Sequence, residues 1–384
     1  MQERKWGKNV RIDQRRRVAA REALEHEFDE LVLIDDAWET LVTGEGARAE
    51  SLHRWLPYRQ QFSPELVRKF FADAGLVPGI VVDPFSGSGT TVIEAARLGQ
   101  AAVGTEALPV LGWLANARGL REAPEPVTPP EPENWRSWWV SQSHPAQKAM
   151  ILCAAARTVT GEGKRKVAAP PWELIRDAHI MVAEELARPL KRPNRVVTGD
   201  ARRMPLADRI AGGMVTSPPY LSRYDYTRVT SFIEALHRNT PLEESRKVQV
   251  TAAVKQGIKP PKATDTHLLP EAVHEILRGL EGAGHRADAA IVRNYFSDMR
   301  KVLVESLRVL RPGAPAWFVI GGADIEHEYI PSDLICAAMG RDVGFAVDGI
   351  IEARRLRLGQ RQLGFLTGIS PRESIVRFRV PDED

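Results

Sequence analysis

The chain has 384 residues, of which 43% are hydrophobic and 27% charged, as in an ordinary globular protein of one large domain or two. Its formal net charge is only +3, so a nucleic-acid partner has to be argued from local patches. Two cysteines are too few for a disulfide framework or a zinc site and fit a reducing compartment. Neither a run of ~18 apolar residues nor the apolar core of a signal peptide is found. We therefore expect a cytoplasmic protein with no membrane partner.

Residues 1–50 change from basic to acidic along the chain. Eight arginines and lysines fall within the first 24 residues, and acidic residues follow up to position 50. We interpret this stretch as an N-terminal helical arm whose basic face meets water, the usual position of charge runs. The alternative is an arm that lies along a phosphate backbone.

The stretch 80–106 carries the most informative pattern. An apolar run ends at Asp83, and Pro84 stops the strand because proline has no N–H and a fixed φ. Residues 86–89, Ser-Gly-Ser-Gly, allow a tight turn close to a ligand, and a helix follows. A second apolar strand ends at Glu106. Together they indicate a nucleoside-binding unit with a carboxylate placed for ribose hydroxyls.

Another apolar strand, 213–216, is also stopped by proline, at Ser217-Pro218-Pro219-Tyr220. Since two prolines restrict the backbone, the Ser217 side chain, the Pro218 carbonyl and the Tyr220 ring share one small region. That region suits a planar base with an exocyclic amino group. The serine and carbonyl oxygens can accept hydrogen bonds from its N–H groups, and the tyrosine ring can stack on the base.

Other segments predict the elements around these two motifs. Ser63 is the N-cap of a helix with Pro64 in its first turn and Glu65 beside the helix dipole. A strand from Arg195 ends at Asp200, an acid that can serve as a helix N-cap, contact a ligand, or do both. Downstream we expect a helix at 295–310, a strand at 316–320, a helix at 332–339, and a reversed hairpin from strands near 345–352 and 374–380.

The first motif, Asp-Pro-Phe-Ser-Gly-Ser-Gly-Thr-Thr at 83–91, resembles the cofactor loop of amino-group methyltransferases that use S-adenosylmethionine (AdoMet). The second resembles the Ser/Asp/Asn-Pro-Pro-Tyr/Phe catalytic motif of the same family, the N4-cytosine/N6-adenine DNA methyltransferases. The resemblance covers residues ~58–106, ~195–228 and ~292–380. It implies an α/β fold with a doubly wound, mostly parallel seven-stranded sheet, Rossmann-like and of the class I AdoMet type, with two largely helical insertions.

The resemblance also implies a domain organisation. We expect a helical arm at 1–50, a catalytic domain formed by 51–106, 195–228 and 292–384, and helical insertions at 107–194 and 229–291. Only a short link separates Asp200 from Ser217, so target recognition falls to one or both insertions, or the second serves as a lid. This order departs from the commonest arrangements of the family and leaves the target DNA sequence open.

The resemblance assigns roles to individual residues. Ser217, Pro218, Pro219 and Tyr220 are the catalytic positions. Glu106 contacts the ribose of AdoMet, Asp200 its adenine, and the helix after Phe62 closes over its methionine end. The full set of cofactor-binding positions is Phe62, Ser63, Asp83, Pro84, Phe85, Ser86, Gly87, Ser88, Gly89, Thr90, Thr91, Glu106, Asp200 and Ala201, and no metal site is expected.

Contact with DNA is expected from aromatic and basic residues near the second motif and near the C-terminus. Tyrosines interleaved with arginines suit base stacking and phosphate contact, and a glycine-containing connection with four arginines suits the backbone, although an exposed loop is a close alternative. These residues are Arg223, Tyr224, Tyr226, Arg228, Arg354, Arg355, Arg357 and Arg361. The expected partner is double-stranded DNA, read at a specific sequence in a prokaryotic nucleoid, with a cognate restriction endonuclease as a further candidate; the oligomeric state is open.

The implied reaction moves a methyl group from AdoMet to the exocyclic nitrogen of a flipped base. Serine at position 217 favours N4 of cytosine, whereas Asp or Asn would favour N6 of adenine. Cys153 and Cys336 lie outside both motifs, which disfavours a C5-cytosine mechanism through a thiolate. The alternatives are an N6-adenine enzyme, an RNA guanine-N2 methyltransferase, and a catalytically silent nucleic-acid-binding protein of the same fold.

Overall fold

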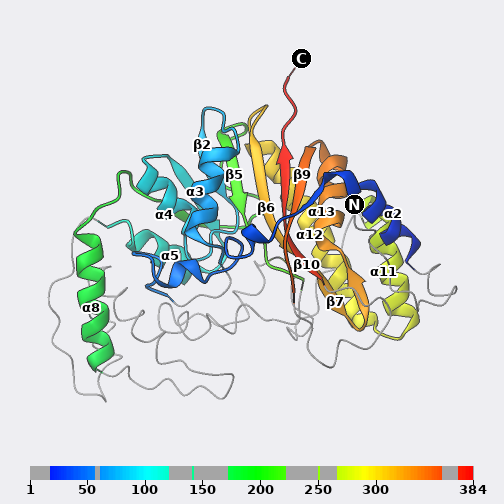
Figure 1. The fold of residues 1–384 in the computed structure, drawn as a ribbon, viewed down its shortest axis with the longest axis horizontal. Coiled ribbons are helices and arrows are strands. Elements are labelled where there is room, and N and C mark those ends of the chain that lie inside the picture. The colour runs from blue at the N-terminus through cyan, green and yellow to red at the C-terminus, as the bar shows by residue number, and fades with distance from the viewer. Residues whose placement is uncertain are drawn as a thin grey trace.

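The computed structural model describes residues 18–56, 61–120, 141, 172–221, 250, 266–356 and 371–383. Within these ranges the chain forms one large sheet flanked by helices, with a small two-stranded hairpin beside it (Figure 1). None of the described helices combines the length and the apolar character needed to cross a bilayer.

Eight strands form the large sheet in the order β1-β9-β10-β6-β5-β2-β3-β4. Neighbouring strands run parallel except β10, which is antiparallel to both β9 and β6. From β2 the chain adds β3 and β4 on one side and then β5 and β6 on the other, so the order reverses between β2 and β5. This confirms the doubly wound, mostly parallel fold. The strands are β1 (Val32–Ile34), β2 (Ile80–Asp83), β3 (Ala102–Glu106), β4 (Val196–Thr198), β5 (Ala211–Thr216), β6 (Pro315–Gly321), β9 (Ala346–Arg355) and β10 (Arg372–Arg379).

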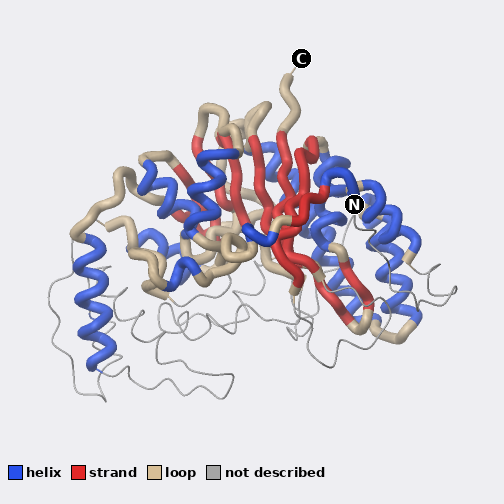
Figure 2. The backbone as a smooth tube through the Cα atoms, in the orientation of Figure 1, coloured by secondary structure: helices blue, strands red, loops and turns tan. Residues whose placement is uncertain are grey.

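Helices cover both faces of the sheet, as Figure 2 shows. Because side chains alternate along a strand, adjacent residues belong to opposite cores. Val81 and Trp317 pack into one core, and Val82 and Phe318 into the other. The first core is covered by α3 (Pro64–Asp73), α4 (Thr90–Leu98), α5 (Pro109–Ala117) and α8 (Trp172–Leu186), the second by α2 (Ala19–Glu27), α11 (Glu271–Gly282), α12 (Arg286–Val309) and α13 (Ser332–Val343).

The N-terminal segment differs from the predicted helical arm. Residues Val32–Ile34 form β1, an eighth strand where seven were expected, and β1 pairs in parallel with β9. It is an edge strand of three apolar residues, and Leu33 and Ile34 are both more than half exposed. Three residues are too few to show a hydrophobic periodicity, and their pairing partner β9 follows more than 300 residues later in the chain.

Helix α2 is docked on the molecule, so the expectation that its basic face meets water is wrong for this segment. Arg21 is only 1% exposed. Its Nε lies 2.7 Å from Glu275 of α11, and its Nη1 lies 2.7 Å from Glu328. The two acids neutralise the buried guanidinium, which is what allows a basic residue to enter the core.

Residues 271–291, which the sequence placed in an insertion, also belong to the helical layer. The fully buried Ile276 and Leu280 of α11 lie in the same core as Val292 and Phe296 of α12. Helix α12 therefore begins nine residues before the predicted start at 295. The charged residues on the outer face of these helices are the reason why the sequence predicted a separate insertion here.

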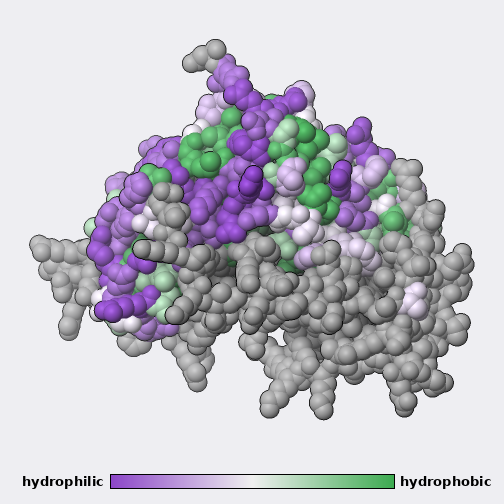
Figure 3. Space-filling view, turned by 180° about the vertical axis from the view of Figure 1, so that it is seen from behind, coloured by the Kyte–Doolittle hydropathy of each residue, from purple (hydrophilic) through white to green (hydrophobic). Residues whose placement is uncertain are grey.

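The strands β7 (Ala323–Ile325) and β8 (Glu328–Ile330) form a hairpin that the sequence did not predict. Its two turn residues, Glu326 and His327, have φ values of +48° and +69°. A two-residue turn with left-handed residues normally carries Gly or Asn, so the signal that would reveal it is missing here. Seen from behind, the described surface is a mixture of hydrophilic and hydrophobic areas (Figure 3).

Candidate active site

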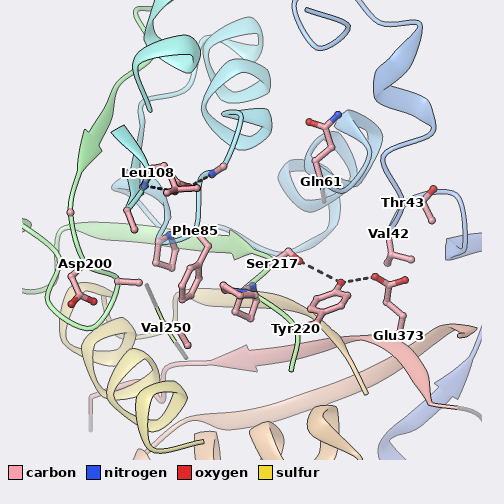
Figure 4. Close-up of a pocket in the computed structure, with 18 of the residues that line it drawn as sticks. Val42, Thr43, Gln61, Phe85, Leu108, Asp200, Ser217, Tyr220, Val250 and Glu373 are labelled. Carbon is pink, nitrogen blue, oxygen red and sulfur yellow. Dashed lines mark hydrogen bonds between the residues drawn. The ribbon is translucent and has the colours of Figure 1, made fainter. Parts of the chain in front are cut away.

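A cavity of about 300 Å³ lies at the carboxyl ends of the parallel strands, next to the point where the strand order reverses. This is where doubly wound sheets bind their ligands. The two sequence motifs meet there: Phe85, Gly87 and Glu106 line it together with Ser217 and Tyr220 (Figure 4). The complete lining is Val42, Thr43, Gln61, Pro84, Phe85, Gly87, Glu106, Ala107, Leu108, Gly199, Asp200, Ala201, Ser217, Pro218, Pro219, Tyr220, Val250, Arg354, Leu356 and Glu373.

Asp83 anchors the glycine-rich loop from below. Its carboxylate accepts hydrogen bonds from Thr91 Oγ1 at 2.7 Å, Thr216 Oγ1 at 2.6 Å and the Phe85 backbone N–H at 3.1 Å. Burial raises the pKa of Asp83 to about 6, against the opposing effect of these three bonds. Asp83 therefore ties the ends of β2 and β5 to the start of α4, which makes it a structural support of the loop.

The loop needs its glycines. Gly87 and Gly89 have φ values of +52° and +93°, in the left-handed region that favours glycine. A Cβ on Gly89 would lie 2.5 Å from the Cβ of Ala115. A Cβ on Gly104, in the neighbouring strand β3, would lie 2.3 Å from Ser86 Oγ. The predicted tight turn is thus observed, and its glycines allow close packing within the protein itself.

Glu106 ends β3 and borders the cavity at 9% exposure. Its Oε2 accepts the Gly87 N–H and its Oε1 the Leu108 N–H, both at 2.8 Å. Desolvation raises the pKa of Glu106 to about 7. The two backbone hydrogen bonds lower this pKa, and the nearby Asp83 raises it. A carboxylate keeps lone pairs beyond these two bonds, so Glu106 can also accept hydrogen bonds from ligand hydroxyls.

Asp200 reaches the cavity, yet its carboxylate is largely engaged. It accepts the Arg202 backbone N–H at 2.8 Å and binds the Arg202 guanidinium through both oxygens, at 2.9 and 2.8 Å. Arg202 in turn lies 3.0 Å from Asp298 of α12. Asp200 therefore caps a turn in place of the helix that the sequence allowed, and Gly199 and Ala201 form the rest of this wall.

Ser217–Tyr220 extend from β5 along the opposite side of the cavity. Ser217 Oγ lies 3.4 Å from Tyr220 OH, and Tyr220 OH donates to Glu373 Oε1 at 2.5 Å. Arg354 Nε donates to Glu373 Oε2, also at 2.5 Å. Ser217, Tyr220 and Glu373 lie in one row, with Asp200 at the far side (Figure 4).

Several predicted positions lie beside the main cavity. Ser63 caps α3, accepting the Glu65 N–H at 3.2 Å as predicted. Thr91 and Gly89 act within the loop, as described above. A smaller hollow next to the cavity is lined by Phe62, Ser86, Ser88 and Thr90 together with Gln61, Asp83, Phe85, Gly87 and Ser217.

The residues predicted to contact DNA divide into three groups. Arg354 lines the cavity and is ion-paired with Glu373. Arg355 is 44% exposed and lies 2.8 Å from Glu352. The remaining predicted nucleic-acid contacts lie outside the described residues: Arg223, Tyr224, Tyr226, Arg228, Arg357 and Arg361.

Some lining residues were missed by the sequence interpretation. Val42 and Thr43 come from the N-terminal segment, Gln61 precedes α3, and Glu373 begins β10. Of these, only Gln61 adjoins a predicted cofactor position, and its Oε1 accepts the Ser88 hydroxyl at 2.6 Å. The others come from distant parts of the chain and carry no local motif.

Three further ligand-type side chains, Glu50, His53 and Glu94, come close together behind the loop. Glu94 already binds His53 at 2.8 Å and Arg68 at 2.8 Å. Burial lowers the pKa of His53, the opposite of what its acidic neighbour would do. With Arg68 and Arg97 both paired to these carboxylates, the cluster is a neutralised ion network that attaches residues 50–53 to α4.

The chain is similar to known DNA methyltransferases. A family model described as "DNA methylase", of the N6/N4 methyltransferases, matches residues 7–110. The chain is 22% identical to "Type II methyltransferase M.BsoBI" of Geobacillus stearothermophilus over 89% of its own length and 88% of that protein. It is 28% identical to "Type II methyltransferase M.AvaI" of Nostoc sp., over 36% of this chain and 31% of that one. A solved SAM-dependent methyltransferase from Methanosarcina mazei overlaps 82% of the chain at a TM-score of 0.34 and 11% identity, too low to carry weight.

The doubly wound sheet with a cavity at its reversal point is the Rossmann-like fold of the class I AdoMet-dependent methyltransferases. Within that class, the chain is similar to the N4/N6 DNA methyltransferases, whose methyl donor is AdoMet, and the family model matches its residues 7–110. The residues that line the cavity fit the nucleoside part of AdoMet. The cavity volume lies at the lower end of the usual range for ligand sites, and a buried carboxylate and a glycine-rich loop border it.

Proposed function

We propose that the protein methylates N4 of a cytosine in double-stranded DNA at a specific sequence. The observation that carries the proposal is that Ser217–Tyr220 border the same cavity as Phe85, Gly87 and Glu106. A donor and an acceptor bound on the two sides would be held next to each other, which is the main contribution an enzyme makes to a transfer between two substrates. The serine at position 217 supports cytosine as the base.

AdoMet would be held by the loop and by the ends of β3 and β4. Glu106 would accept the ribose hydroxyls, Phe85 would pack against the adenine, and the Asp200 turn would border it. Asp83, Thr91 and Ser63 would act by holding this wall in place. The bound cofactor supplies an electrophilic methyl group on a sulfonium centre.

The target base would be flipped out of the duplex into the side of the cavity nearest Tyr220. Ser217 Oγ and the Pro218 carbonyl would accept its two amino N–H bonds, and the Tyr220 ring would stack on it. These bonds draw the nitrogen toward a tetrahedral geometry and free the lone pair that is otherwise delocalised into the ring. Fixed dipoles placed in this way lower the barrier without a strong base.

A covalent mechanism through cysteine is not part of this proposal. Cys336 lies in α13, fully buried, and burial raises the pKa of its thiol well above the ordinary value. Cys153 lies outside the described residues. The reaction at an exocyclic amine needs no thiolate.

The contact with DNA is proposed to involve Arg355 and the arginines and tyrosines that the sequence singled out after Tyr220 and after Leu356. The lining residue Arg354 would act inside the cavity instead. A cognate restriction endonuclease is the proposed partner in the cell, in keeping with the names of the type II relatives.

The test is methyl transfer from labelled AdoMet to unmethylated genomic DNA, followed by mass spectrometry of the nucleosides. We expect N4-methylcytosine, and a loss of at least about 100-fold in rate for Ser217→Ala, in the range of a lost transition-state hydrogen bond. Ser51→Ala, at an exposed serine outside the cavity, is the control and should keep the wild-type rate. N6-methyladenine would overturn the choice of base, label on RNA alone the choice of substrate, and AdoMet binding without any transfer the catalytic role.

A further inference from the structure

Four side chains from β9, β10 and the segment after β5 form a chain of hydrogen bonds at one wall of the cavity. Ser217 follows β5, Glu373 is in β10 and Arg354 is in β9, with Tyr220 between the first two (Figure 4). The oxygen–oxygen separations are 3.4 Å from Ser217 to Tyr220 and 2.5 Å from Tyr220 to Glu373. Glu373 is 3% exposed and its second oxygen accepts Arg354 Nε at 2.5 Å.

The chemistry of these groups gives the chain a direction. An ionised carboxylate can only accept, so the Tyr220 O–H must donate to Glu373. The Tyr220 oxygen then offers a lone pair to Ser217, whose single proton turns toward it. The remaining lone pairs of Ser217 Oγ are left open to the cavity.

That direction matters for a substrate amine. An exocyclic amino group presents N–H donors, so the serine assists the reaction only if its oxygen faces the amine as an acceptor. A serine proton pointing at the same place would oppose an N–H donor or would occupy the nitrogen lone pair that has to attack the methyl group. The Ser217–Tyr220 separation of 3.4 Å is long for a hydroxyl bond, and such contacts shorten when the substrate is bound.

We propose that Glu373 is a positioning residue that acts through Tyr220 to keep Ser217 oriented as a hydrogen-bond acceptor for the amino group of the target base. This inference rests on the proposed function. Arg354 holds Glu373 in place from its other side, so that both carboxylate oxygens are committed. The competing interpretation is that Glu373 and Arg354 form a cross-strand ion pair that merely stabilises the β9–β10 ladder.

The first variant is Glu373→Gln, which keeps the size of the side chain and an oxygen for Arg354 but places an amide N–H donor within reach of Tyr220. We expect the single-turnover rate to fall by about 10- to 100-fold, as for the loss of one hydrogen bond to a charged group. The dissociation constants for AdoMet and DNA should stay within about twofold, because both oxygens of Glu373 are engaged by Tyr220 and Arg354. Asp348→Asn is the matched control, since it breaks the Asp348–Arg379 ion pair at 2.8 Å across the same two strands, and it should keep the wild-type rate.

The second variant is Tyr220→Phe, which leaves the stacking ring and the Glu373–Arg354 pair in place and removes only the hydroxyl. It should lose a similar factor in rate. If Glu373 acts through that hydroxyl, adding Glu373→Gln to Tyr220→Phe costs less than about twofold more, whereas independent effects multiply. This comparison stays decisive even if Glu373→Gln alone destabilises the protein, because a structural loss would persist in the double variant.

A wild-type rate for Glu373→Gln, or multiplied losses in the double variant, would overturn the inference. Its failure can be told apart from failure of the proposed function. A wild-type protein that does not methylate cytosine in DNA refutes the proposed function, whereas an active wild-type protein with an unaffected Glu373→Gln variant refutes only the role of Glu373.

Discussion

The charge state of Glu106 should control the affinity for the nucleoside part of the cofactor. The perturbation is a change of pH from 6 to 8, applied to the wild-type protein and to Glu106→Gln. Methylthioadenosine is the probe because it keeps the ribose hydroxyls and has no group that titrates in this interval. Only the ionised carboxylate can accept both its two backbone N–H bonds and the ribose hydroxyls without carrying a proton of its own.

The magnitude follows from the raised pKa of Glu106, about 7 in the free protein. At pH 6 the protonated form exceeds the ionised form by about ten to one, and at pH 8 the ratio is reversed. If the ionised form binds, the affinity rises by about tenfold between these values and is flat above pH 8. Asp83, with a pKa of about 6, has its two oxygens committed to Thr91, Thr216 and Phe85 and should add little.

Isothermal titration calorimetry at five pH values measures this dependence. Glu106→Gln should bind more weakly at pH 8 and with an affinity that does not change with pH. Glu271→Gln, at an exposed acid paired with Arg278 on α11, is the control and should keep the wild-type slope. A flat profile for the wild-type protein, or a slope that survives in Glu106→Gln, would refute the reasoning.

Two further predictions concern the fold around the site. Arg21→Met leaves the buried Glu275 and the half-buried Glu328 without their cation and should lower the free energy of unfolding by about 3 kcal/mol in urea titrations, whereas Glu27→Gln, at an exposed ion pair of the same helix, should cost less than about 1 kcal/mol. Equal effects would contradict the assignment of Arg21 to the core. Gly321→Ala places a Cβ 2.4 Å from the Tyr220 ring and should reduce kcat by about 100-fold at little change in AdoMet affinity. Gly282→Ala, where a Cβ meets nothing within 4 Å, should leave kcat unchanged, and a wild-type kcat for Gly321→Ala would show that the ring position is not critical.

The parts of the site that the sequence predicts are those written in consecutive residues. The cap at Ser63, the strand stopped after Asp83 and the left-handed Gly87 and Gly89 all depend on local backbone chemistry, and all are observed. The acid at the end of β3 was equally visible, because a strand followed by a polar residue has its own pattern. Local rules therefore located the loop side of the cavity.

The opposite wall depends on pairings between distant segments. Val42 and Thr43 reach the cavity because the N-terminal segment runs beside β9, and no local signal in 384 residues encodes that contact. Arg354 was interpreted as a DNA contact because arginines in a connection usually face solvent. Its position in β9, opposite Glu373 in β10, directs it to the cavity instead.

Topology explains why Glu373 is where it is. In a doubly wound sheet the active site lies at the carboxyl ends of the parallel strands, so an antiparallel strand begins at that same edge. Glu373, the second residue of β10, accordingly pairs with Gly321, the last residue of β6. A Cβ on Gly321 would touch the Tyr220 ring, so the register alone brings residue 373 beside the Ser217–Tyr220 motif. The start of the antiparallel strand is thus a place where this fold can add a side chain to its active site, and an acid there can reach Tyr220 without any change in the loops.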